Sequence, residues 1–127
     1  MRKLKYILAL VTLVFALTSP GQEVSIESIR QGLISLDANQ KLTQKDKLQL
    51  LYAWKRQADA RRLPQYSVYA RLLHKIGVYE FYVTHRYTVA LEVTLQALRI
   101  NTSGKAGASA AAAATDLYNV GIYYDNL

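Results

Sequence analysis

The sequence contains little of the material from which small functional sites are usually made. It has no cysteine, which excludes a disulfide framework, a thiolate metal site and a cysteine nucleophile. Two histidines and two prolines leave little for a metal cluster or a proline-rich ligand. The main apolar run, residues 6–17, is 12 residues long, whereas a transmembrane helix needs about 20, so we expect no membrane span. The length of 127 residues allows one small domain.

Residues 1–21 have the order of features that is typical of a secretory signal peptide. Cationic residues lie within positions 1–5, the apolar run follows, and small residues with a proline come next. Ser19 and Gly21 fit the two small-residue positions before a cleavage at Gln22. We therefore expect an exported protein, periplasmic or secreted, with a mature part at residues 22–127. An uncleaved anchor or a buried core helix is the alternative interpretation.

The net charge is modest once this leading segment is set aside. The whole chain carries +7, but 13 cationic residues against nine acidic ones leave +4 for the remainder. The basic and aromatic stretch at residues 61–75 superficially suggests a phosphate-binding surface. The expected export and the small net charge favour a different interpretation of this stretch. In it, the tyrosines pack between helices and the charged side chains stay in solvent. We expect no nucleic-acid partner.

The remainder of the chain has the apolar spacing of helices. Ser25 can cap a first helix whose apolar positions 26, 29, 33 and 36 form one stripe. Thr43, with Asp46 at the capping-box distance, begins a second helix that ends near Pro64. The second helix is expected to bury Leu48, Leu51, Ala58 and either Trp54 or Leu50. Further helices are expected at about 66–83, at about 87–100 and from Ala110 onward, after a loop at 102–107. The prediction is an all-α fold of antiparallel neighbours joined by short turns.

Two segments 44 residues apart share a pattern. Residues 73–81 read LHKIGVYEF and residues 117–125 read LYNVGIYYD, so Leu, an aliphatic residue, Gly, an aliphatic residue and Tyr recur in order. The helix between them carries Ala90 and Ala97, seven residues apart. Small residues at these points let two helix backbones approach closely. The expected packing positions are Leu73, Gly77, Ala90, Ala97, Leu117 and Gly121.

This pattern resembles the tetratricopeptide repeat (TPR), a helix–turn–helix unit of 34 residues. The resemblance implies a degenerate leading helix pair at 25–65, a repeat unit at 70–103 and the first helix of an incomplete further unit at 107–127. The spacing from Gly77 to Ala90 is one residue longer than in the family, so the helix is registered on Gly77 or on the next residue. Extra residues before the second copy make the chain similar to the exported N-terminal sensor region of bacterial TPR-containing signalling proteins of the sensor histidine kinase type.

The resemblance also implies a concave groove, lined by the first helices of successive units, that binds peptides or extended segments. The groove-facing candidates are Arg71, His74, Lys75 and Val78 or Tyr79 in the first copy, and Thr115, Tyr118, Asn119, Ile122 and Asp125 in the second. Lys75 and Asn119 match two members of the family's carboxylate clamp, and its other positions are missing here.

No pattern of catalytic residues is found in the sequence. His74 and His85 lie 11 residues apart, on a helix and in a turn, and the nucleophile, phosphate-loop and zinc-protease motifs are absent. We therefore expect a non-enzymatic module, without cofactor or metal, for protein interaction or scaffolding in the sensing part of a bacterial signal-transduction protein. A small exported basic bundle that binds membrane lipid or an anionic polymer is the alternative.

The last expected helix has an apolar face and no helix after it to cover that face. Solenoid units bury such faces by stacking, so we expect partial exposure of Leu117, Val120, Ile122, Tyr123 and Tyr124. We predict on this basis either a truncated reading frame or an amino-terminal piece of a longer parent protein, membrane-tethered there or in contact with further repeats of its own. A soluble, monomeric and cooperatively unfolding form of residues 22–127 would contradict this prediction.

Overall fold

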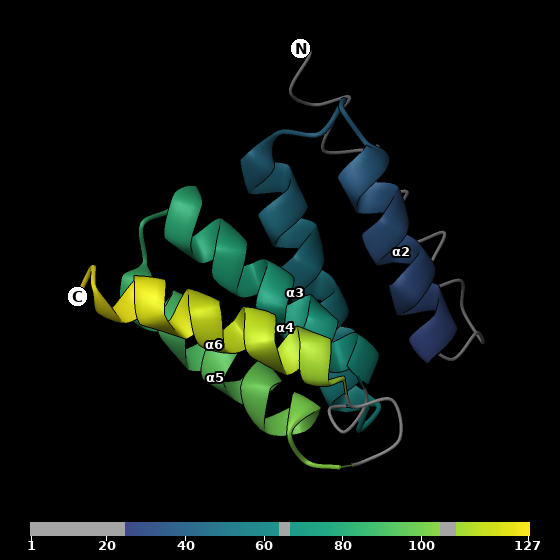
Figure 1. Cartoon of the computed structure of the whole chain (residues 1–127). Helices are drawn as coiled ribbons and strands as arrows, with labels where there is room; N and C mark the ends of the chain where they lie inside the picture. Colours follow the sequence, from purple (N-terminus) through teal and green to yellow (C-terminus); the bar gives the residue numbers. More distant parts are fainter. Residues whose placement is uncertain (1–24, 64–66, 105–108) are drawn as a thin grey trace.

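The computed structural model describes residues 25–63, 67–104 and 109–127. Within these ranges the chain forms five helices and no strand, which confirms the predicted all-α class. The helices are α2 (Ile26–Ala38), α3 (Gln44–Ala60), α4 (Ser67–Tyr82), α5 (Tyr87–Asn101) and α6 (Ala110–Tyr124). Figure 1 shows α2 beside α3, then α4 beside α5, with α6 lying against the second pair. The predicted signal peptide lies outside the described residues.

Two helices begin at capping boxes. Ser25 Oγ accepts a hydrogen bond from the Ser28 backbone N–H at 3.1 Å, and Ser28 Oγ accepts one from the Ser25 N–H. Thr43 Oγ1 and Asp46 make the same reciprocal pair at the start of α3. Each box satisfies two backbone donors that a helix start otherwise leaves unpaired. Both caps were predicted from local sequence, and both are confirmed.

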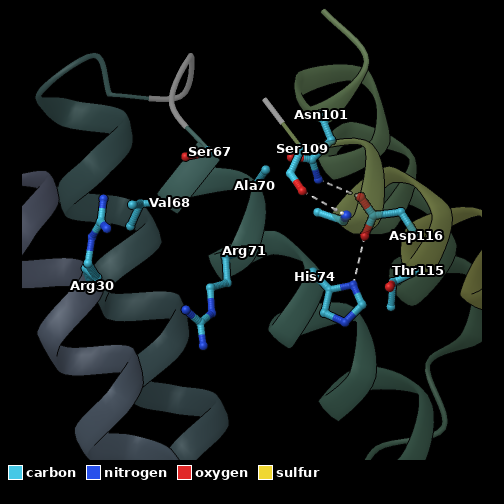
Figure 2. A pocket seen from close by; sticks show the side chains of 11 residues that line it. Arg30, Ser67, Val68, Ala70, Arg71, His74, Asn101, Ser109, Thr115 and Asp116 are labelled. Carbon is cyan, nitrogen blue, oxygen red and sulfur yellow. Dashed lines mark hydrogen bonds and ion pairs between the residues drawn. The ribbon is translucent and has the colours of Figure 1, made fainter. Parts of the chain in front are cut away.

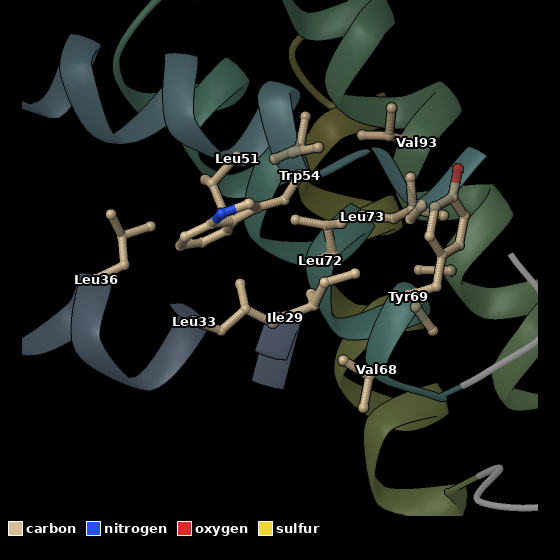
Figure 3. Packing of buried hydrophobic residues seen from close by; sticks show 14 of the residues in the cluster. Ile29, Leu33, Leu36, Leu51, Trp54, Val68, Tyr69, Leu72, Leu73 and Val93 are labelled. Carbon is tan, nitrogen blue, oxygen red and sulfur yellow. The ribbon is translucent and has the colours of Figure 1, made fainter. Parts of the chain in front are cut away.

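The main core joins α2, α3, α4 and α5. Its largest side chain is Trp54, which is 2% exposed, and Figure 3 shows Leu33, Leu51 and Leu72 around its ring. A Cβ added to Gly32 would lie 2.7 Å from Trp54 Cζ2, so the glycine of α2 makes room for this ring. Leu50 and Trp54 are both buried, whereas the sequence pattern had offered them as alternatives.

α4 and α5 approach each other closely at Gly77. A Cβ on Gly77 would lie 2.3 Å from Thr94 Oγ1 and 3.2 Å from the Ala90 carbonyl oxygen. Ala90, Thr94 and Ala97 are fully buried along the facing side of α5. The small residues therefore do what the sequence pattern predicts there, because they allow two backbones to approach, and Leu73 fills the adjoining space at 0% exposure.

The last helix packs mainly on α5, and near its end also on α4, through one face. Tyr123 is 1% exposed and its ring stacks on Phe81 with ring centroids 4.6 Å apart. The partial exposure predicted for Tyr123 is therefore wrong. On the opposite face, Leu117 is 57% exposed and a Cβ on Gly121 would meet nothing within 4 Å. Among the described residues, Leu117 and Gly121 do not make the helix contact expected of them, since α6 turns its other side to α5.

Candidate functional site

A pocket of about 420 Å³ lies where α2, α4 and α6 come together (Figure 2). Single residues of α2 and α5 line it, together with the first two turns of α4 and α6. The lining residues are Arg30, Ser67, Val68, Ala70, Arg71, His74, Asn101, Ser109, Ala112, Thr115 and Asp116. The pocket therefore collects residues that are up to 86 positions apart in the chain.

One wall of the pocket is a hydrogen-bonded network around a buried carboxylate. Asp116, which is 1% exposed, accepts a hydrogen bond from Asn101 Nδ2 at 2.8 Å on one oxygen. Its other oxygen lies 2.8 Å from His74 Nδ1. Because an ionised carboxylate only accepts, His74 Nδ1 carries the proton in this pair. The network joins α4, α5 and α6, and no described residue bonds His74 Nε2.

The opposite wall carries two guanidinium groups. Figure 2 shows Arg30 and Arg71 on the α2 side of the pocket, across from the Asp116 network. Arg30 Nε lies 3.4 Å from Glu27 in an exposed pair, which is weakly stabilising at most. Arg71 makes no ion pair with a residue of the described ranges. The cationic groups at this wall thus keep most of their capacity to bind an anion.

The starts of two helices also border the pocket. α4 begins at Ser67 and α6 at Ala110, and the Ser109 side chain accepts a hydrogen bond from the Ala112 backbone N–H at 3.2 Å. Backbone N–H groups and the helix dipole make such ends electropositive. Together with the arginines, they lie around a pocket whose lining contains one carboxylate, that of Asp116, with both oxygens already bonded.

Lys75 and Tyr79, both predicted for the groove, lie beside α2 and do not line this pocket. Lys75 Nζ lies 2.6 Å and 2.7 Å from the two oxygens of Asp37. Burial, followed by the nearby Asp37 charge, raises the pKa of the half-buried Tyr79. The ion pair between Lys75 and Asp37 links α4 to α2, and Tyr79 lies at the same contact. These residues therefore hold α2 against α4, and the ammonium of Lys75 is already paired.

The four remaining candidates of the second copy lie apart from the pocket, along α6 and just after its end. Tyr118 is 71% exposed and Asp125 is exposed. Asn119 is half-buried, and Ile122 packs against the cluster of Phe81 and Tyr123. Of the candidates taken from the sequence, the structure brings together Arg71, His74 and Thr115.

Sequence reasoning missed Asp116, Asn101 and Arg30. One signal for Asp116 was present: with the 44-residue offset of the repeat, it aligns with Leu72, which is 0% exposed. An acid at a position whose counterpart is a core leucine needs a buried partner. Arg30 left no comparable signal, because it is one exposed cation on the polar side of α2.

A second buried carboxylate, that of Glu80, closes the turn between α4 and α5. Glu80 is 0% exposed, its Oε2 lies 3.3 Å from Arg86 Nη1, and Thr84 Oγ1 donates to its Oε1 at 3.2 Å. Burial and then the Glu80 charge raise the pKa of Tyr52. The two partners of the carboxylate, Thr84 and Arg86, follow Glu80 closely in the chain, so we assign Glu80 a structural role.

Comparison of the chain with protein-family models, curated proteins and solved structures gives no match. The observations define the class: a small all-helical domain whose antiparallel neighbours pack in sequence. Across the described ranges, no helix is both long and apolar enough to cross a membrane. The same ranges hold no group of three or more side chains suited to a metal ion.

Proposed function

We propose that this chain is a non-enzymatic interaction module that holds an extended segment of a partner protein in the pocket between α2, α4 and α6. The observation that carries the proposal is the pocket itself, which joins every second helix on one side of the domain. First helices of successive pairs line the groove in a TPR-like solenoid, so the arrangement supports the family resemblance. The module acts by shape and charge, and makes or breaks no covalent bond.

The pocket favours a segment that carries a carboxylate. A guanidinium group binds a carboxylate through two parallel hydrogen bonds, and Arg71 makes no ion pair within the described ranges that would compete. The helix starts at Ser67 and Ala110 favour the same sign of charge. The volume of about 420 Å³ suits a few side chains rather than a folded partner. An acidic side chain or a peptide's terminal carboxylate meets these conditions.

The finer parts of the proposal rest on the sequence. Residues 1–21 support export to the periplasm or beyond the cell, and the repeated pattern at 73–81 and 117–125 supports a TPR-like unit. We accordingly place the module in the sensing or scaffolding N-terminal part of a bacterial signal-transduction protein. Its partner is a protein or peptide, or further repeats of its own parent chain.

Peptide selection tests this proposal. Peptides selected from a random displayed library on the purified chain should be enriched in Asp, Glu or a free C-terminus that contributes to binding. Arg71→Glu should weaken the selected peptide about tenfold or more, because it removes a charge-assisted hydrogen bond and adds repulsion. Arg56→Glu is the matched control, since Arg56 is exposed on α3 and does not line the pocket.

Two results would count against peptide binding. One is a selection without acidic preference, and the other is an equal effect of Arg71→Glu and Arg56→Glu. The alternative, a basic bundle on lipid or an anionic polymer, is favoured by the exposed Arg56, Arg61 and Arg62 at the end of α3. Binding to anionic vesicles that is lost with Arg56→Glu and kept with Arg71→Glu would select that alternative.

A further inference from the structure

The outward face of α6 is an exposed apolar stripe. We call it the outer stripe, and it consists of Ala111, Ala114, Leu117, Tyr118, Gly121 and Tyr124. Leu117, Tyr118 and Tyr124 are 57%, 71% and 55% exposed. Large apolar side chains gathered on one side of a surface helix are characteristic of a contact surface.

The repeat shows what normally covers such a stripe. With the offset of 44 residues, Ala114, Leu117 and Gly121 correspond to Ala70, Leu73 and Gly77 of α4. Ala70 and Leu73 are 0% exposed and Gly77 is buried, because α5 lies against α4 with its own small residues facing that glycine. The same pattern on α6 thus fits an antiparallel helix that brings small residues to Gly121.

The outer stripe of a second copy meets this description. In an antiparallel pair centred between positions 117 and 118, the stripe maps onto itself: Ala111 faces Tyr124, Ala114 faces Gly121, and Leu117 faces Tyr118. A large side chain opposes a small one in the outer pair, and the two small residues of the next pair let the backbones approach. This register pairs all six residues of the outer stripe.

The charges favour the same arrangement. Residues 109–127 contain no Lys or Arg, although the chain has 16 of them, so α6 itself brings no cation that must be desolvated or that repels its copy. Depletion of lysine and enrichment of tyrosine are typical of protein interfaces. In the antiparallel pair, Asp125 lies beside Ala110 in the first turn of the other α6, where the helix dipole stabilises a carboxylate.

We propose that the outer stripe is a homodimer interface, in which α6 of one copy packs antiparallel on α6 of the other. The proposal goes beyond peptide binding in the pocket and does not depend on it. One helix pair buries less than the roughly 1,200 Å² of a standard interface, so the dimer forms reversibly as concentration rises. It gives the assembly two pockets, one per copy.

Sedimentation equilibrium of the full chain tests association. The average mass should rise from one chain to two over a roughly hundredfold range of concentration. Leu117→Lys should shift the midpoint at least about tenfold higher, because it places two cations at the centre of the contact. Gln96→Lys, on the exposed side of α5, is the charge-matched control and should leave the midpoint unchanged. Circular dichroism verifies that both variants keep their helices.

Two outcomes would overturn the proposal. A chain that stays monomeric throughout the range has no such interface, and the outer stripe is then covered by another protein or another segment. Association that survives Leu117→Lys proceeds through another surface. Neither outcome bears on the peptide selection, which tests the pocket around Arg71 and not the outer stripe.

Disulfide trapping tests the orientation, and the absence of native cysteine removes any background. Tyr118→Cys, next to the symmetry axis, should cross-link to itself under mild oxidation. Ala111→Cys and Tyr124→Cys should cross-link to each other when the two variants are mixed, and neither should cross-link to itself. Self-linking of all three variants would indicate a parallel pair and would refute the antiparallel register.

Discussion

At the scale of single residues, two glycines with the same sequence pattern differ completely in their surroundings. Gly77 lies where α4 and α5 touch, and Gly121 lies on an open face of α6. The local sequence around each is Leu, two residues, aliphatic, Gly, aliphatic, Tyr, so nothing in the pattern distinguishes them. The difference is set by the neighbouring helix, which one glycine has and the other lacks among the described residues.

The two glycines should respond to alanine in opposite directions. Gly77→Ala places a Cβ 2.3 Å from Thr94 Oγ1, and this overpacking should cost about 1–2 kcal/mol of unfolding free energy after the gain in helix propensity. Gly121→Ala meets no neighbour and should stabilise by up to about 1 kcal/mol. Urea unfolding at a low chain concentration measures both. Equal effects would show that α4 and α5 are not in close contact at Gly77.

At the scale of elements, the helices are predictable from local sequence to within one or two residues, except that α3 ends at Ala60, four residues before Pro64. Caps at Ser25 and Thr43 specify where α2 and α3 start, and apolar steps of three and four specify which side each of them buries. The pocket is not predictable in this way. It depends on Asp116, which bonds residues 15 and 42 positions away on two other helices.

Removing the Asp116 carboxylate should loosen three helices together. Asp116→Ala leaves Asn101 Nδ2 and the proton of His74 Nδ1 without their acceptor, which should cost about 1–3 kcal/mol of unfolding free energy. Glu92→Ala, an exposed acid on α5, is the control and should change the stability by less than about 0.5 kcal/mol. Hydrogen exchange should accelerate at the start of α6. Equal stability of the two variants would refute a structural role for the network.

At the scale of the whole molecule, α6 is held to the rest by buried aromatic contacts. Tyr123 stacks on Phe81, and burial raises the pKa of its hydroxyl from 10 to about 12. Tyr69 has a raised pKa as well, through burial and its hydrogen bond to Asp59. Both pKa shifts favour the protonated tyrosine in the folded state. The free energy of unfolding should therefore depend on pH in the alkaline range.

Stability should be lost as pH rises through this window. Below pH 10 the Tyr123 hydroxyl is protonated in both states and has no effect on the pH dependence. Between 10 and about 12 the unfolded chain releases this proton while the folded chain retains it, which should lower the unfolding free energy by about 2–3 kcal/mol. Unfolding curves across this range should show a smaller loss for Tyr123→Phe. An identical slope would mean that Tyr123 is accessible to solvent.

The all-α class, most helix ends and the buried sides of α2 to α5 follow from the chain alone, because caps and apolar spacing act over one or two turns. The same local rules placed Gly121 and Leu117 in contacts that the described structure does not contain, and they left Asp116 and Arg30 unnoticed. Which helix covers which stripe, and which polar groups meet in the pocket, depends on pairings between distant segments. Those pairings arise only when the helices pack, since no short stretch of sequence encodes the neighbour it will find.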